Sequence, residues 1–372
     1  MQTEPTPSQT IQAEVTCPSC AAHLKYKPGT DSLKCEYCNA DVDIEKSEEI
    51  IQEIDFERFL ASNEGVTVQQ EIITIRCEGC GAHVTLDPNI VSDRCPFCNS
   101  ILVTKMAVKE SQIAPGSVLP FGIDAKQAFG EFKKWISKLW FAPNELKRFA
   151  IQPETLKGIY VPFWTYDSKT YNIYSGQRGD NYYVNENYTT TENGRTVTKT
   201  RTVTKIRWTS VSGEFGRDFD DVLVLASKSL PQKYADKLQP WDLNKLVPFN
   251  EKYLSGYRTE TYQVELKDGF AAAQQVMDNE LRAETCQRIG GDHQRIHSLR
   301  STYNNVTFKH ILLPVWISAF RYRTKVYRFL VNGRTGEVQG ERPYSAWKIA
   351  GLVILILIAI GIIAAVVASQ NG

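Results

Sequence analysis

The motifs C-P-S-C at residues 17–20 and C-E-Y-C at 35–38 recur as C-E-G-C at 77–80 and C-P-F-C at 95–98, each 60 positions later. Paired C-x-x-C motifs about fifteen residues apart are typical of a hairpin that coordinates one metal ion. The sequence therefore predicts two copies of one four-cysteine unit. The eight candidate ligands are Cys17, Cys20, Cys35, Cys38, Cys77, Cys80, Cys95 and Cys98.

Zinc is the metal that such a unit predicts, because Zn²⁺ prefers four tetrahedral ligands and binds thiolates well. Four cysteines leave no open coordination position, so we expect two structural Zn²⁺ ions as cofactors and no catalytic metal. The residue after each C-x-x-C turn often needs a left-handed backbone. Asn39, Gly81 and Asn99 tolerate that conformation, and Ala21 is the exception. Units this small are expected to fold only together with their metal.

Disulfide bonds are the alternative use of these cysteines. Residues 1–13 are polar and lack the apolar core of a secretory signal, so a cytosolic chain with reduced thiols is expected. A redox role would need a thioredoxin-like strand–helix context, which the sequence lacks. His23 and His83 could also act as ligands, but four cysteines already suffice. Both histidines are therefore expected to pack or to form hydrogen bonds.

Residues 349–368 form an uncharged apolar run. A helix of that length spans about 30 Å, the thickness of the hydrocarbon layer, whereas a buried core helix would rarely lack a polar face. Arg342 and Lys348 precede the run and no charge follows it, and Tyr344 and Trp347 stand where interfacial anchors are expected. We therefore expect a single-pass protein of the cell inner (cytoplasmic) membrane, with the N-terminus and the bulk of the chain in the cytoplasm.

Charge divides the chain into two parts. Residues 1–110 carry 9 Lys and Arg against 18 Asp and Glu, whereas the remaining residues carry 34 against 24. Nucleic-acid-binding proteins usually show a basic footprint, and a phosphate backbone would repel an acidic unit. A protein partner is therefore the favoured ligand of the four-cysteine units, and nucleic acid is less favoured. Small residues in the apolar run leave a homo-oligomer open.

The fold class that follows is α+β, with two tandem four-cysteine zinc ribbons, a mixed β-rich cytosolic domain with helices, and one C-terminal transmembrane helix. The boundaries rest on composition, turn signals and apolar periodicity. The predicted segments are disordered residues 1–13, zinc ribbon 14–45, linker helix 46–70, zinc ribbon 71–110, linker 111–118, β-rich α+β domain 119–343 and transmembrane helix 349–368.

Local signals predict individual helices inside these segments. Helices are expected over 47–61, 125–140, 231–239 and 268–288. Ser47 is the expected N-cap of the first helix, and Asp124 with Gln127 makes a capping box before the second. Cys286 on the last helix is expected to be a small buried residue.

Strands are expected over 158–226 and 306–341. Thr, Val and basic residues alternate over 187–208 around Asn193-Gly194, a strong hairpin turn. V-P-F-W at 161–164 is echoed by L-P-V-W at 313–316, which suggests two related β-units. The basic hairpin residues could touch anionic lipid headgroups, although a soluble hairpin with a charged face is favoured. They are Arg195, Lys199, Arg201, Lys205 and Arg207.

One polar cluster resembles a catalytic site. It comprises Asp292, His293, Arg295 and His297, and a histidine beside a carboxylate can do acid–base work. No nucleophile or second carboxylate accompanies it at a telling spacing, so a hydrogen-bonded structural cluster is favoured. The sequence also lacks a P-loop, a G-x-S-x-G elbow and an H-E-x-x-H motif. The chain is therefore not expected to be an enzyme, and without a Walker A motif it is not expected to be a helicase.

Four stretches resemble a family of bacterial membrane-anchored zinc-ribbon proteins. They are Y-Q-V-E-L-K-D-G-F at 262–270, G-G-D-H-Q-R-I-H at 290–297, F-K-H-I-L-L-P-V-W at 308–316 and Y-R-F-L-V-N-G-R-T-G-E-V-Q-G-E-R-P-Y-S at 327–345. Members are often labelled as transcription-factor-IIB-type zinc-ribbon proteins or as similar to the primosomal replication helicase. Some are linked to membrane-stress systems with flotillin-like and phage-shock-type partners. The resemblance implies a C-terminal span and ribbons that recruit a partner, and it brings no catalytic residues.

Three functions follow in order of preference. The first is a membrane-anchored zinc-binding adaptor that recruits a cytosolic protein partner to the membrane in a membrane-stress response. The second is a nucleic-acid-binding zinc-ribbon protein, related to replication or transcription and held at the membrane, which the basic β-rich half leaves open. The third is an enzyme that uses the polar cluster at 292–297.

Overall fold

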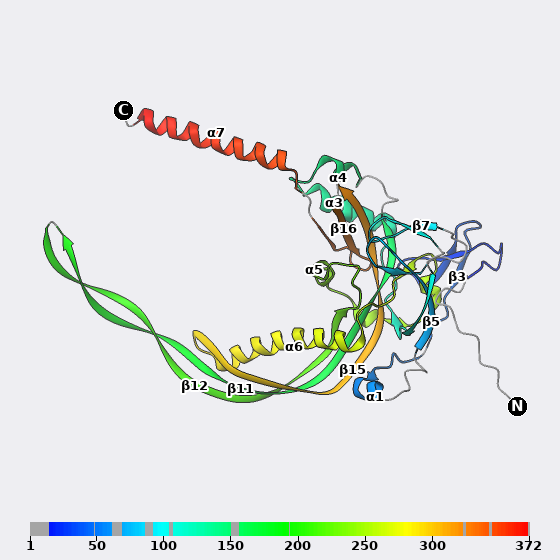
Figure 1. Cartoon of the computed structure of the whole chain (residues 1–372), viewed down its shortest axis with the longest axis horizontal. Coiled ribbons are helices and arrows are strands. Elements are labelled where there is room, and N and C mark those ends of the chain that lie inside the picture. The colour runs from blue at the N-terminus through cyan, green and yellow to red at the C-terminus, as the bar shows by residue number, and fades with distance from the viewer. Residues whose placement is uncertain are drawn as a thin grey trace.

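The chain forms a mixed α/β, sheet-rich body with one C-terminal apolar helix (Figure 1). The predicted disordered segment 1–13 and the turn residue Asn193 lie outside the residues that the structure describes. The computed structural model describes residues 15–47, 49–61, 69–85, 92–103, 107–149, 156–192, 194–322, 325–341 and 344–370.

Three long antiparallel strands form the spine of the main sheet. They are β11 (Lys157–Glu192), β12 (Arg195–Leu225) and β15 (His293–Tyr322), in the order β12-β11-β15. Apolar and aromatic residues on both sides of their central stretch are buried, as a sheet covered on two faces requires. Shorter strands complete the sheet: β4 (Ile54–Asp55), β10 (Ser117–Val118), β13 (Val247–Pro248), β14 (Arg258–Thr259), β16 (Lys325–Asn332) and β17 (Val338–Gly340).

V-P-F-W and L-P-V-W lie side by side at the centre of this sheet. The antiparallel register places Tyr160 opposite Pro314, and Pro162 opposite Leu312. Alternate residues of both motifs, Val161, Phe163, Leu313 and Val315, join one apolar cluster, whereas the two tryptophans, Trp164 and Trp316, join two other clusters. Their similar composition therefore follows from a shared environment on neighbouring strands.

Beyond Gly179 the sheet narrows to a two-stranded hairpin, called the arm (residues 180–208). β15 pairs with β11 only as far as Gly179, whereas β11 and β12 stay paired as far as Glu192 and Arg195. The arm leaves the body as a long curved ribbon (Figure 1). The predicted hairpin is confirmed by the pairing of Glu192 with Arg195, but the paired strands are much longer than the predicted 187–208.

The arm has two chemically different faces, because cross-strand partners share a face and successive residues alternate. On one face Arg201 lies over the ring of Tyr188, and Lys205 forms an ion pair with Glu186. The other face carries uncharged side chains, and side-chain hydrogen bonds such as that from Thr200 to Asn187 connect its two strands. Its residues include Asn181, Asn185, Asn187, Thr196, Thr198, Thr200, Thr202 and Thr204.

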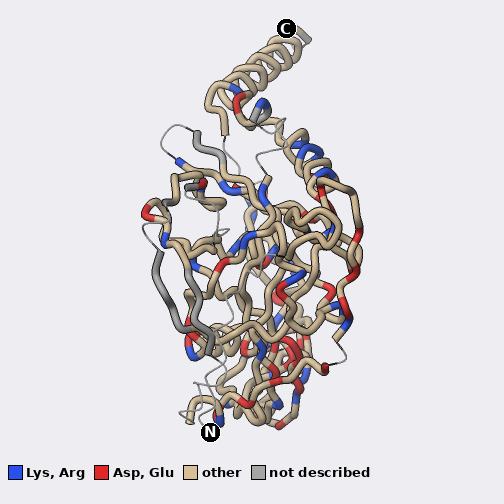
Figure 2. The backbone as a smooth tube through the Cα atoms, turned by 90° about the vertical axis from the view of Figure 1, so that its right-hand side faces the viewer, with Lys and Arg blue, Asp and Glu red and all other residues tan. Residues whose placement is uncertain are grey.

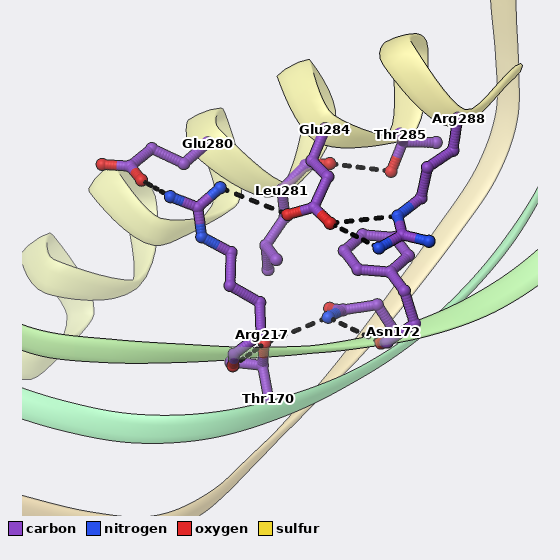
Figure 3. Close-up of polar contacts among 9 residues, drawn as sticks. Thr170, Asn172, Arg217, Glu280, Leu281, Glu284, Thr285 and Arg288 are labelled. Atoms are coloured by element: carbon purple, nitrogen blue, oxygen red, sulfur yellow. Dashed lines mark hydrogen bonds and ion pairs between the residues drawn. The ribbon is translucent and has the colours of Figure 1, made fainter. Parts of the chain in front are cut away.

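Helix α6 (Leu266–Ile289) braces the root of this hairpin. Its buried face includes Ala273, Met277 and Leu281, which join the aromatic core of the sheet. Arg217 on β12 bridges Glu280 and Glu284 on the helix, as Figure 3 shows. The expected helix over 268–288 is thus confirmed, although its Cys286 is only partly buried.

Helix α3 (Ala125–Ser137) confirms the second predicted helix. The side chain of Asp124 accepts a hydrogen bond from the backbone N–H of Gln127 at 2.7 Å, and the side chain of Gln127 accepts one from the backbone N–H of Asp124 at 3.0 Å, so the capping box is present. Phe132 packs on Phe329 of β16, with ring centroids 5.4 Å apart. A short helix, α4 (Asn144–Phe149), follows after a tight loop.

Three predicted segments differ from the structure. The helix expected over 47–61 is shortened to α1 (Phe56–Ala61), because Ile54 and Asp55 pair with β15 as strand β4 and Asp55 then caps the helix. The expected linker 111–118 contains the end of β9 (Ala107–Ile113) and β10. The helix expected over 231–239 divides into α5 (Gln232–Ala235) and the 3-10 turn Asp236–Leu238, and further 3-10 turns lie at Leu243–Lys245 and Glu251–Leu254.

Helix α7 (Ala346–Gln370) projects from the body (Figure 1). Residues Ala346–Val367 are long and apolar enough to cross a membrane, with a mean hydropathy of 3.2 and none of the window buried. The start of the helix is tied to the loop between α3 and α4. Ser345 donates its backbone N–H to Phe141 at 2.8 Å, and Lys348 Nζ lies 2.8 Å from the Ala142 carbonyl.

Candidate metal centres

The first four-cysteine unit is a small three-stranded sheet. It consists of β1 (Leu24–Tyr26), β2 (Ser32–Cys35) and β3 (Asp41–Asp43), in the order β1-β2-β3. One cysteine pair precedes β1, and the other lies at the turn between β2 and β3. The hairpin therefore brings both pairs to the same end of the unit.

The second unit repeats this plan with different strands. Strand β5 (Gln69–Arg76) pairs with β6 (His83–Val84) and β9, and β7 (Ser92–Arg94) pairs with β8 (Ile101–Val103). One cysteine pair lies between β5 and β6, and the other lies between β7 and β8. The 60-residue repeat in the sequence is thus a repeat of local structure.

All four C-x-x-C turns have the same backbone. In each, the residue after the second cysteine donates its N–H to the carbonyl of the first cysteine at 2.7–3.0 Å. The first cysteine in turn donates to the carbonyl of the residue two positions beyond the second cysteine. The left-handed residues are Ala21, Asn39, Gly81 and Asn99, with φ of 59°, 59°, 75° and 62°. The predicted left-handed positions are confirmed, and Ala21 adopts the conformation as well.

Ala21 is the one turn residue of the four that is neither glycine nor asparagine, the two residue types that tolerate the left-handed conformation best. Its side chain is exposed, so the methyl group contributes no packing. Ala21→Gly is expected to stabilise the protein by about 1 kcal/mol, measured as a raised Tm in thermal unfolding. The matched control is Asn39→Gly, for which a smaller gain is expected because asparagine tolerates the left-handed region. A lower Tm for Ala21→Gly would contradict this account.

The sulfur atoms converge in two groups of four. Within each group all four Sγ atoms lie within 4.8 Å of one another. The Sγ atoms of Cys17 and Cys38 are 3.6 Å apart, and those of Cys77 and Cys98 are 3.5 Å apart. A disulfide needs about 2.05 Å, so these thiols are unbonded. Four thiolates at about 2.3 Å from a central Zn²⁺ lie about 3.8 Å apart, so both groups have the dimensions of a tetrahedral metal centre.

Backbone N–H groups lower the pKa of two cysteines in the first unit and so favour their thiolate form. The backbone N–H of Ser19 lowers the pKa of Cys17 to about 6, and that of Cys38 lowers the pKa of Cys35. The Ala22 amide acts in the same direction on Cys20, but the neighbouring thiols outweigh it and raise the pKa of Cys20 to about 12. In the first unit two sulfurs thus favour the thiolate form and two favour the thiol form, whose protons a divalent metal ion would displace.

The structure places both histidines outside the ligand groups, which contain cysteine alone among the described residues. The side chain of His23 is exposed, and its backbone bridges to Thr16, so of the two predicted roles, packing or hydrogen bonding, the structure does not favour packing. His83 is half-buried on β6, and its carbonyl accepts a hydrogen bond from Thr261 at 3.2 Å.

Both units are docked on the main sheet. In the first unit, Tyr26 is buried and donates its N–H to Ser255 at 3.0 Å, while Ser255 Oγ donates to the Leu24 carbonyl at 2.5 Å. In the second, Thr85 donates to Thr259 at 3.0 Å. Five of the eight cysteines join the apolar clusters of the body, namely Cys17, Cys35, Cys77, Cys95 and Cys98. The units and the body therefore share one core.

Sequence reasoning missed an acidic group on the main sheet, at the β-bulge of β11. Ligand oxygens of Asp167, Asp220 and Asp221 lie within 4.8 Å of one another. Lys309 forms ion pairs with this group and with Glu53, with its Nζ 2.7 Å from Asp221 and 3.2 Å from Glu53. Burial raises the pKa of Asp167 to about 6. A lysine thus serves as the cation here, and the only sequence signal was the doublet at 220–221.

The polar cluster at 292–297 is exposed and does not converge on one point. Asp292 accepts the backbone N–H of Asn181 at 2.8 Å, and His293 Nε2 lies 3.1 Å from the Asn181 side chain. Arg295 stacks on Trp208 at 3.9 Å. These contacts fasten the start of β15 to the root of the arm.

No family model and no solved structure matches the chain. The chain is similar to the uncharacterized protein YdjG of Bacillus subtilis (strain 168). The two are 25% identical over 345 residues, which cover 90% of this chain and 91% of YdjG. The similarity is therefore not confined to the cysteine motifs.

Proposed function

We propose that this chain is a zinc-binding adaptor, anchored in the cytoplasmic membrane by α7, that recruits a cytosolic protein partner. The observation that carries the proposal is the pair of complete four-sulfur groups on the same body as an unburied apolar helix. Four thiolates close each centre, so the metal supports a surface and leaves no position for a substrate. The resemblance described above favours a role in the response to membrane stress.

The first unit offers the surface best suited to a partner. Tyr37, between the two cysteines of its second turn, is 87% exposed. Its sequence neighbour Glu36 is exposed and forms an ion pair with Lys25. An exposed aromatic side chain on a rigid turn is a typical anchor of a protein interface. Residues 1–110 carry 9 Lys and Arg against 18 Asp and Glu, and this net acidic charge favours a basic protein partner.

The test uses the full chain, because strand β4, within residues 1–110, pairs with β15 of the main sheet. Wild type, Tyr37→Ala and Tyr183→Ala are expressed in cells, crosslinked and purified from membranes. Tyr183 is a matched control, since it is 72% exposed and lies on the arm. Tyr37→Ala is expected to lower recovery of the partner about tenfold, while Tyr183→Ala leaves it unchanged. The affinities of the three purified proteins for the purified partner are expected to follow the same order. Equal recovery by all three proteins would overturn the proposal.

Nucleic-acid binding is the second candidate, and the arm is the part that would favour it. Several of its cations are already paired, since Lys205 and Arg201 contact Glu186 and Lys199 contacts Glu192. Such pairing reduces the charge available to a phosphate backbone. Binding of DNA or RNA whose affinity falls steeply with salt would favour this candidate over the adaptor.

A further inference from the structure

The loop between α3 and α4 lies level with the start of α7. Phe141 accepts the backbone N–H of Ser345 at 2.8 Å, and Lys348 Nζ contacts the Ala142 carbonyl and Asn144 Oδ1, both at 2.8 Å. The uncharged run begins at the next residue, Ile349. If α7 crosses the membrane from that point, the loop lies at the depth of the lipid headgroups.

Trp140 occupies this loop and is 80% exposed. An indole exposed to that extent has no packing role inside the protein, and tryptophan is enriched at the membrane–water interface. Trp347 at the start of α7 is 87% exposed, and Tyr344 is also exposed. Three aromatic side chains from two separate parts of the sequence are therefore presented at one level.

Exposed cations accompany these aromatic residues. Lys138 lies at the C-terminal end of α3, two residues before Trp140, and Lys133 and Arg148 are exposed on α3 and α4. Figure 2 shows Lys and Arg positions on the helices below the start of α7. Glu131 is already paired with Lys134. Cations beside interfacial aromatics match the anionic headgroups of a cytoplasmic leaflet.

We propose that Lys138, Trp140 and Arg148, together with Tyr344 and Trp347, form a second membrane-contact surface that binds anionic phospholipid. This inference rests on the proposed function, because it takes α7 as the span that fixes the depth of the loop. The surface limits rotation and tilt of the body relative to the bilayer, since the chain then touches the membrane at α7 and at the loop. The four-cysteine units would be presented in one orientation.

The test measures quenching of tryptophan fluorescence by brominated lipid. The full chain is reconstituted into nanodiscs that contain phosphatidylglycerol and phosphatidylcholine, with or without bromine near the headgroup end of the acyl chains. Trp164 and Trp316 are buried in the body and serve as an internal background. Trp140→Phe and Trp347→Phe are each expected to remove roughly half of the lipid-quenched emission, because two exposed indoles lie at the interface. Trp208→Phe, on the arm, is expected to remove none.

The outcomes separate the inference from the proposed span. Loss of quenching in Trp347→Phe but not in Trp140→Phe would overturn the contact surface and leave the span intact. Absence of quenching in wild type would overturn the span itself. Lys138→Glu, or omission of phosphatidylglycerol, is expected to lower the quenching that depends on Trp140, whereas the exposed control Lys228→Glu has no effect. Equal Trp140 quenching in all of these samples would overturn the role of anionic lipid.

Discussion

Replacing Cys77 and Cys95 together with serine is expected to destabilise the whole body, beyond the second four-cysteine unit. Both residues are buried in the apolar cluster that contains Ile159 and Val315 of the main sheet. Loss of a structural metal centre leaves that side of the core unpacked. The expected decrease in the free energy of unfolding is on the order of 5 kcal/mol or more. We expect one cooperative transition at a much lower Tm in the thermal unfolding of the detergent-solubilised protein.

Cys286→Ser is the matched control for this experiment. Cys286 is the ninth cysteine, lies far from both sulfur groups in the sequence and is only partly buried. Elemental analysis of the same preparations is expected to give two zinc ions per chain for wild type and the control, and one or none for the double variant. An unchanged Tm, or equal zinc content in all three proteins, would contradict the assignment.

Replacing Glu260 with glutamine is expected to remove a large pH dependence of stability. Glu260 is 1% exposed and accepts a hydrogen bond from Ser227 Oγ at 2.9 Å. Burial raises the pKa of its carboxyl group to about 8, from an ordinary value of 4.5. The folded protein therefore keeps a proton that the unfolded chain releases between these two pH values.

The sign follows from this difference in bound protons. Because the native state binds more protons between pH 4.5 and 8, the free energy of unfolding falls as pH rises through that window. The wild type is expected to lose up to about 4 kcal/mol relative to Glu260→Gln between pH 5 and pH 8. Urea unfolding at a series of pH values measures the difference. The exposed Glu265→Gln serves as a control, and parallel pH profiles for wild type and Glu260→Gln would refute the argument.

Features set by short stretches of sequence were predictable. A left-handed turn residue is dictated by the C-x-x-C geometry itself, so Asn39, Gly81 and Asn99 could be recognised from their identity alone. The capping box of α3 depends on residues three apart, Asp124 and Gln127. The apolar run at 349–368 is likewise visible from its composition, which the unburied helix α7 matches.

Features that depend on distant partners were not predictable. Docking of the first unit uses a bond between Leu24 and Ser255, which no local signal reveals. Ile54 reads as part of a helix, but pairing with Phe308 of β15 makes it a strand. The length of the arm depends on continuous pairing of β11 with β12, whose polar Thr-rich stretch lacks the apolar alternation that marks a buried strand.

The arm also sets how far one copy of this protein can reach. From Gly179 to Glu192 the strand advances thirteen residues, which at about 3.3 Å each corresponds to about 40 Å beyond the three-stranded root. That distance is about five Debye lengths at physiological ionic strength. The charges at the tip are therefore screened from the acidic four-cysteine units of the same molecule. The ion pairs at the tip are therefore electrostatically independent of the body that carries them.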